Sequence, residues 1–403
     1  MTAEFDANPT LPGVPDPYPI YRTVRETDPV HWCPGAKLWA ITRYADAEVV
    51  LKSDQFSRQA FLDQVQARLG DQPIVRMQRH ELVFTDNPRH HELRVLITSV
   101  LTPKSMQALQ PQVQEFIERQ LGALRSRGEM DVIGDFARTY PTQVAAMWLG
   151  VPESERAQIV EWIFPLVAGR GVARDPESTA AANRAADQFT QYFRELIARR
   201  RADPQDDLVS SFVQAAAASG GLMSDDDLIS LFIAVFAAGH GPGIALLANT
   251  LLALLRHPEE WDRLRSHPEW VPSAVEEGLR FDPPTQAPNP LAALADVEVG
   301  GKQIRRGDVV SVIIGAVNRD PAAFPDPERF DITRHPNRHL AFSGGEHFCL
   351  GATLARVEGQ LALQALVQGF PSLRLAIPER ELTWIPHDRF RTLARLPVVW
   401  GVS

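Results

Sequence analysis

The longest apolar stretch of the chain runs from Leu228 to Leu255, and it restricts the fold more than any other feature. It is a poor membrane span because polar or helix-breaking residues interrupt it at His240, Pro242, Asn249 and Thr250. We therefore expect a long helix buried inside a large domain. The chain has 403 residues, 44% of them hydrophobic, which is enough to build such a core without disulfides.

The pattern around this stretch predicts a mainly α chain with a small β portion at its edge. Residues 1–60 combine proline turns with strand-like runs, and 9–19 is an extended lead-in; the segment from about 86 to 280 is helical in pattern. Strand character returns at 290–315, a helix is expected at about 350–369, and 382–400 alternates like strands. No change of composition marks a boundary, so we expect one domain spanning residues 1–403.

Charge and cysteine content exclude several classes of protein. The net charge of −9 argues against a general nucleic-acid binder, whose phosphate contacts need excess Lys and Arg. Two cysteines, Cys33 and Cys349, cannot form a disulfide framework and fit a reducing cytoplasm. The first residues have neither a basic nor an apolar segment, so they do not predict a signal peptide.

The sharpest motif is Phe342-Ser-Gly-Gly345-Glu-His347-Phe-Cys349-Leu-Gly351, followed by a helical run. The glycines permit a tight turn, and Cys349 precedes a helix N-terminus, where thiolate is favoured. Three roles remain open for Cys349. It could be a buried structural residue, a nucleophile with His347 as an awkwardly close base, or a thiolate ligand of iron shielded by Phe342.

At this point the chain resembles the cytochrome P450 family of haem-thiolate monooxygenases, since the Phe-x-x-Gly-x-His-x-Cys-x-Gly spacing is complete. Glu277-Gly-Leu-Arg280 resembles the family's Glu-x-x-Arg, and 318–334 resembles the meander before the haem loop. Residues 86–94 resemble its haem-contacting third helix. The resemblance implies a triangular fold with a large helical part and a small β-rich edge.

The resemblance also implies roles for individual residues. Cys349 ligates the iron of haem b within a loop that includes Phe342, Gly345 and Gly351. His90 and Arg94 bind one haem propionate and His347 the other. Glu277 and Arg280 form a buried network with a meander arginine, Arg334. From spacing alone, both the Glu277–Arg280 pair and the His90–Arg94 pair could instead lie on a solvated surface.

Two positions depart from the family pattern. Many relatives have a propionate-binding arginine where this chain has Pro290. In the long helix, the acid and alcohol that help protonate bound dioxygen are replaced by Gly241 and Pro242, beside Gly239 and His240. We expect these four to be the catalytic segment, with protons arriving through water or a substrate hydroxyl. His240 is either a proton relay or a histidine that points away into helix packing.

The implied activity is insertion of one oxygen atom from O2 into a lipophilic small molecule, as hydroxylation or epoxidation, in bacterial secondary metabolism. Electrons would come from a ferredoxin and an NAD(P)H-dependent reductase, which would dock on Arg89, Lys104, Arg338 and Arg356 unless these are ordinary surface arginines and lysine. We expect a cytoplasmic monomer that binds neither membrane nor nucleic acid. The candidate substrate contacts are Phe61, Val83, Val235, Ala238, Leu291 and Thr392. Peroxide-driven or non-oxygenating chemistry, and ligand binding without turnover, are the alternatives.

Overall fold

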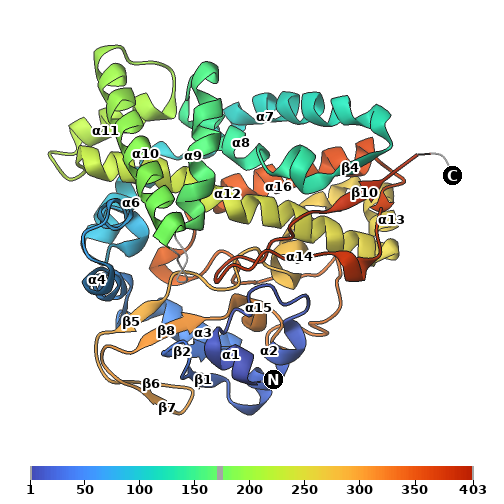
Figure 1. The fold of residues 1–403 in the computed structure, drawn as a ribbon, viewed down its shortest axis with the longest axis horizontal. Coiled ribbons are helices and arrows are strands. Elements are labelled where there is room, and N and C mark those ends of the chain that lie inside the picture. Colours follow the sequence, from blue (N-terminus) through green and yellow to red (C-terminus); the bar gives the residue numbers. More distant parts are fainter. Residues whose placement is uncertain (1, 170–175, 402–403) are drawn as a thin grey trace. The chain divides into compact units, whose positions relative to one another are not determined.

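The computed structural model describes residues 2–169 and 176–401. The chain forms two compact units, and each contains segments distant in sequence. The first comprises residues 1–56, 113–138 and 241–403, and the second comprises 57–112 and 139–240. Helices dominate both, which confirms the expectation of a mainly α chain with small sheets (Figure 1).

The first unit contains nearly all of the β structure. Its helices are α1 (Thr2–Ala7), α2 (Tyr18–Thr27), α3 (Tyr44–Lys52), α13 (Pro258–Ser266), α14 (Val271–Phe281), α15 (Ile314–Val317) and α16 (Ala352–Gly369). Its strands are β1 (Val30–Cys33), β2 (Leu38–Ile41), β4 (Glu129–Asp131), β5 (Leu291–Ala293), β6 (Val297–Val299), β7 (Lys302–Ile304), β8 (Val309–Val312), β9 (Arg374–Leu375) and β10 (Pro397–Val399).

The second unit is helical. Its helices are α4 (Arg58–Leu69), α5 (Pro73–Gln78), α6 (Arg89–Val100), α8 (Tyr140–Leu149), α9 (Arg156–Ala168), α10 (Pro176–Ala202) and α11 (Leu208–Ala218). Three elements cross from one unit to the other: β3 (Phe56–Ser57), α7 (Pro103–Leu124) and α12 (Asp225–Arg256). The helix α12 is the long apolar stretch expected from the sequence, and it runs unbroken through Pro242.

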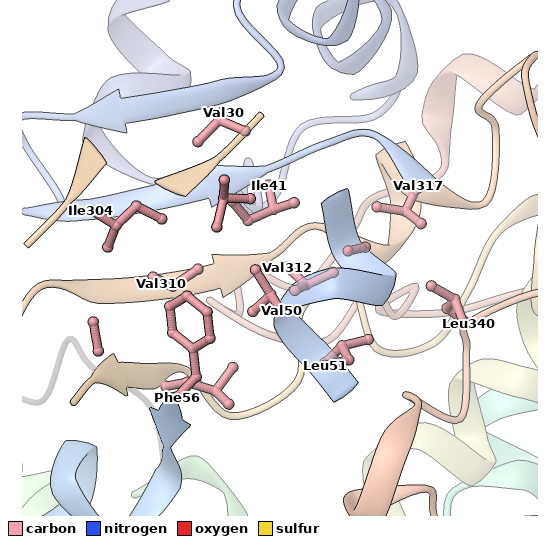
Figure 2. Packing of buried hydrophobic residues seen from close by; sticks show 14 of the residues in the cluster. Val30, Ile41, Val50, Leu51, Phe56, Ile304, Val310, Val312, Val317 and Leu340 are labelled. Carbon is pink, nitrogen blue, oxygen red and sulfur yellow. The ribbon is translucent and has the colours of Figure 1, made fainter. Parts of the chain in front are cut away.

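The main sheet has the strand order β1-β2-β8-β5-β3. In it β2 pairs in parallel with β8, with Ile41 opposite Val312, and β8 pairs antiparallel with β5, with Val310 opposite Leu291. Figure 2 shows apolar side chains from these strands packing on α3. Leu51 of α3 and Leu340 belong to this core and lie next to the loop that leads to Cys349.

Two local expectations were only partly correct. Residues 1–60 contain the expected strands β1 and β2 but also three complete helices and the start of α4, and α2 begins at Tyr18, inside the expected lead-in. Its buried residues Tyr18, Tyr21 and Val24 recur every three positions, a helical signal that the neighbouring prolines obscured. Only β10 forms a strand within 382–400; Trp384, Phe390 and Leu393 make isolated bridges.

Within the described residues, α12 is the one helix long and apolar enough to cross a membrane. More than half of its most apolar window, 56%, is buried inside the protein. A buried core helix of a globular domain has the same length and composition.

Candidate functional site

The loop before α16 is held by contacts that require its glycines. Gly345 has φ +66°, and a Cβ there would collide with the backbone carbonyl of Leu51 in α3. The Cys349 N–H donates to the Phe342 carbonyl at 3.0 Å, and the Ala352 N–H donates to the Cys349 carbonyl at 3.3 Å. Cys349 is exposed and immediately precedes the N-terminus of α16. The loop thus presents a sulfur at a helix end that favours thiolate.

Phe342, the first residue of this loop, is buried. The Arg356 guanidinium lies 4.5 Å from the centre of its ring and donates to both carboxylate oxygens of Glu276, at 2.7 and 2.9 Å. Burial would raise the pKa of Glu276, but hydrogen bonds from His339 and Arg356 outweigh it and hold that pKa at about 2. A charged Glu276 therefore fixes Arg356 over Phe342 at neutral pH.

The Arg280 guanidinium donates two hydrogen bonds to the Glu277 carboxylate, each 2.8 Å long, and both side chains are completely buried. Arg280 also donates to three meander carbonyls, those of Asn318, Pro327 and Arg329. Arg334 lies 3.2 Å from Glu277. The structure thus shows a buried network rather than a solvated surface pair.

In the second unit, buried positive charge gathers at the start of α6. His90 and Arg58 are buried, and Arg94 is half-buried. Burial, then the charges of Arg94 and Arg58, lower the pKa of His90 to about 4, and Asp86 opposes them. Neutral His90 and the nearby guanidinium groups of Arg94 and Arg58 together provide hydrogen-bond donors and positive potential for a carboxylate. No sequence motif marks Arg58, so it was not among the expected site residues.

The middle of α12 is open. Ala238 is exposed, although the neighbouring Phe236 and Ala237 are buried. At Gly239, no heavy atom of the described residues outside the helix backbone lies within 4 Å of an added Cβ. Val235 is half-buried. This face therefore has room for a bound group.

His240 does not share that open face. It is buried, and its Nδ1 lies 2.8 Å from the Thr142 hydroxyl on α8. The ring of Phe164 on α9 packs edge-on against the His240 ring, with 4.6 Å between the ring centres. His240 therefore points into the packing between helices, the second of the two positions considered from the sequence. A relay role would require the ring to leave these contacts.

The next residues of α12 belong to the first unit. A Cβ added at Gly241 would lie 3.3 Å from the Phe390 ring, so a side chain there would require Phe390 to shift. Pro242 lies inside the helix and cannot donate a hydrogen bond. Neither residue supplies a side-chain proton.

The remaining candidate residues occupy varied environments. Phe61 and Val83 are half-buried in the second unit. Leu291 is a core residue of the main sheet and belongs to the apolar cluster of Figure 2. Thr392 is half-buried, and its carbonyl accepts a hydrogen bond from the Ile385 N–H at 2.9 Å. Leu291 is thus placed by sheet packing.

The four candidate docking cations are also held differently. Arg89 pairs with Asp227 at 2.8 Å, and Arg356 is held by Glu276. Arg338 is exposed. The side chain of Lys104 lies outside the described residues.

Taken one by one, these features are of the kinds that hold a haem. An exposed sulfur at a helix N-terminus suits a thiolate-ligated iron, the cations around His90 suit propionate carboxylates, and the small residues of α12 leave space for a flat ring.

Comparison with known proteins gives consistent matches. The cytochrome P450 family model matches residues 173–381. The chain is 35% identical over 387 residues to the biotin biosynthesis cytochrome P450 of Bacillus subtilis, covering 96% of each. It is 36% identical to the mycinamicin IV hydroxylase/epoxidase of Micromonospora griseorubida, covering 94% of each. A myxobacterial cytochrome P450, CYP267B1, solved with myristic acid, has a TM-score of 0.88 at 34% identity, covering 96% of this chain and 97% of that one.

Proposed function

The chain belongs to the cytochrome P450 family of haem-containing monooxygenases, and from that premise we propose that it hydroxylates or epoxidises a lipophilic small molecule, with haem b as cofactor. We further propose a cytoplasmic monomer that takes electrons from a ferredoxin and an NAD(P)H-dependent reductase. The observation that supports this most is the exposed Cys349 sulfur, held before α16 by the Phe342 hydrogen bond and the Gly345 turn.

Cys349 would ligate the iron, with His90, Arg94 and Arg58 near one propionate and His347 near the other. When bound, the haem supplies dioxygen activation, which the thiolate favours by donating electron density. The protein's own residues orient the substrate, exclude water and control protons. Arg356 packs on the Phe342 ring of the loop, and Gly241 and Pro242 leave proton delivery to water or the substrate.

The test of this function is replacement of Cys349. Cys349→Ser should retain the fold but lose the ferrous–CO absorption band typical of thiolate-ligated haem, together with product formation. The matched control is Cys33→Ser, because Cys33 is buried in β1. It should keep both signals. An unchanged CO spectrum in Cys349→Ser would refute the ligand assignment.

The missing acid and alcohol favour a second candidate, peroxide-driven oxygenation. Turnover of one spectrally identified binder should be compared with ferredoxin, reductase and NAD(P)H and, separately, with hydrogen peroxide. Product only with the electron chain supports the monooxygenase. Product mainly with peroxide supports the second candidate and removes the role of docking cations.

A further inference from the structure

The segment from Pro386 to Arg391 lies against α12 and against the segment 284–286. The Arg389 carbonyl accepts from the Gln286 N–H at 2.8 Å, and the Arg391 N–H donates to the Pro284 carbonyl at 2.8 Å. The Phe390 ring faces Gly241 of α12. The segment is therefore fixed beside Gly241 of α12.

Two arginines of this segment differ sharply in their partners. Arg391 is buried and fully paired: it donates to Asp282 at 2.9 Å and to the carbonyls of Val14 and Pro15, and it stacks on Trp384. It stabilises the fold. Arg389, two residues earlier, makes no side-chain hydrogen bond and no ion pair with any residue that the structure describes.

The Arg389 side chain is nevertheless half-buried. Its Nε is shielded from solvent without a hydrogen-bond partner among the described residues, and the group lies 5.3 Å from the Phe390 ring centre. Burial lowers the pKa of Arg389, and the charge of Asp388 only partly opposes this. A cation with a solvent-shielded, unpartnered N–H would gain a charge-assisted hydrogen bond from an anionic group that binds there.

His387 provides a second donor of the same kind. Its Nδ1 accepts from the backbone N–H groups of Arg389 and Phe390, at 3.1 and 3.3 Å, and lies 3.3 Å from an oxygen of Asp388. Two N–H groups pointing at Nδ1 place the proton of the neutral ring on Nε2. That Nε2 is shielded from solvent and has no partner among the described residues.

We propose that Arg389, assisted by His387, binds a carboxylate of the substrate, so that this enzyme acts on lipophilic carboxylic acids. The planar guanidinium suits a carboxylate, and a charge-assisted bond in a site shielded from water is among the stronger polar contacts. The apolar remainder would lie along Phe390 and α12. The inference rests on the proposed function and specifies its substrate class.

The test measures binding to the haem-loaded protein by calorimetry. Two matched pairs serve as probes: dodecanoic acid with 1-dodecanol, and 4-phenylbenzoic acid with 4-phenylbenzyl alcohol. The wild type should bind at least one acid about tenfold more tightly than its alcohol, a difference of about 1.4 kcal/mol. Arg389→Gln should abolish this preference without weakening alcohol binding, whereas Arg389→Lys should keep part of it.

Arg395→Gln is the matched control, because Arg395 follows the segment by only four residues but is exposed. It should leave the preference for the acid unchanged. Equal binding of acid and alcohol by the wild type in both pairs would overturn the proposal, and so would an Arg389→Gln variant that keeps the preference.

A haem propionate is the other possible carboxylate, since Pro290 replaces the arginine found there in many relatives. Transfer of haem from each variant to apomyoglobin separates the two sources. Unchanged transfer in Arg389→Gln, with loss of the acid preference, supports the substrate carboxylate. Faster transfer with no acid preference in the wild type assigns Arg389 to the haem and overturns the proposal. Failure of turnover both with ferredoxin, reductase and NAD(P)H and with hydrogen peroxide would instead count against the proposed function, because binding is measured separately.

Discussion

At the residue scale, burial decides what a charged side chain contributes. Glu277 and Arg280 are both fully buried, and each satisfies the other. Arg265 and Asp262 have the same spacing on α13 but lie 41% and 70% exposed. A buried pair that loses one member leaves an uncompensated charge, whereas an exposed pair returns to water.

Glu277→Gln should therefore lower the free energy of unfolding by about 3–5 kcal/mol, because Arg280 would keep its charge without a carboxylate. Urea unfolding monitored by circular dichroism measures the change. Arg265→Gln should change it by less than about 1 kcal/mol. Similar effects of the two substitutions would show that the buried network does not stabilise the fold.

Glu358, on α16, gives a pH-dependent prediction. Burial raises its pKa from 4.5 to about 8. Between these values the unfolded chain has released the proton that the folded chain keeps, so the free energy of unfolding should fall as the pH rises. Glu358→Gln should reduce this fall between about pH 5 and pH 8 by a few kcal/mol, at about 1.4 kcal/mol for each pKa unit.

The measurement is chemical unfolding at both pH values. Glu118 is exposed on α7, so Glu118→Gln should leave the decrease in the free energy of unfolding between the two pH values as it is in the wild type. A Glu358→Gln variant with the full wild-type fall would contradict the assignment.

At the element scale, α12 combines helix continuity with an unusual interior. Pro242 lies inside the unbroken helix but has no N–H, so the carbonyl four residues earlier, on the exposed Ala238, loses its usual helical donor. A carbonyl in that position can accept from water. We propose that a water held by this carbonyl takes part in proton delivery.

Pro242→Thr should therefore raise the fraction of NAD(P)H electrons that appear in product, because it returns a hydroxyl to α12. Pro242→Ala is the matched control: it restores the N–H without the hydroxyl and should not improve coupling. The coupling is measured from the amounts of product formed, NAD(P)H consumed and hydrogen peroxide released. Equal coupling in wild type and Pro242→Thr would count against any role for the missing alcohol.

At the scale of the whole molecule, the two cysteines occupy opposite environments. Cys33 is buried in β1, and burial raises its pKa to about 12, whereas Cys349 is exposed. Native haem-free protein should therefore react with one equivalent of a thiol reagent and unfolded protein with two. Haem should protect Cys349, and Cys349→Ser should abolish the native reaction. Mass spectrometry identifies the modified residue; labelling of Cys33 in native protein would contradict the burial.

The sequence alone determined the features that depend on neighbours along the chain. The loop from Phe342 to Gly351 was readable because its glycines, histidine and cysteine act within one turn. Glu277 and Arg280 could be paired because helical geometry brings positions three apart together. The length and apolarity of α12 likewise follow from its own residues.

The tertiary structure decided whatever depends on partners far along the chain. His240 packs on Thr142 and Phe164, which no local pattern could indicate. The difference between Arg389 and Arg391 rests on Asp282, more than a hundred residues away. The physical reason is that the strength of a charge or hydrogen bond depends on burial and on the groups opposite it, and folding alone brings those groups together.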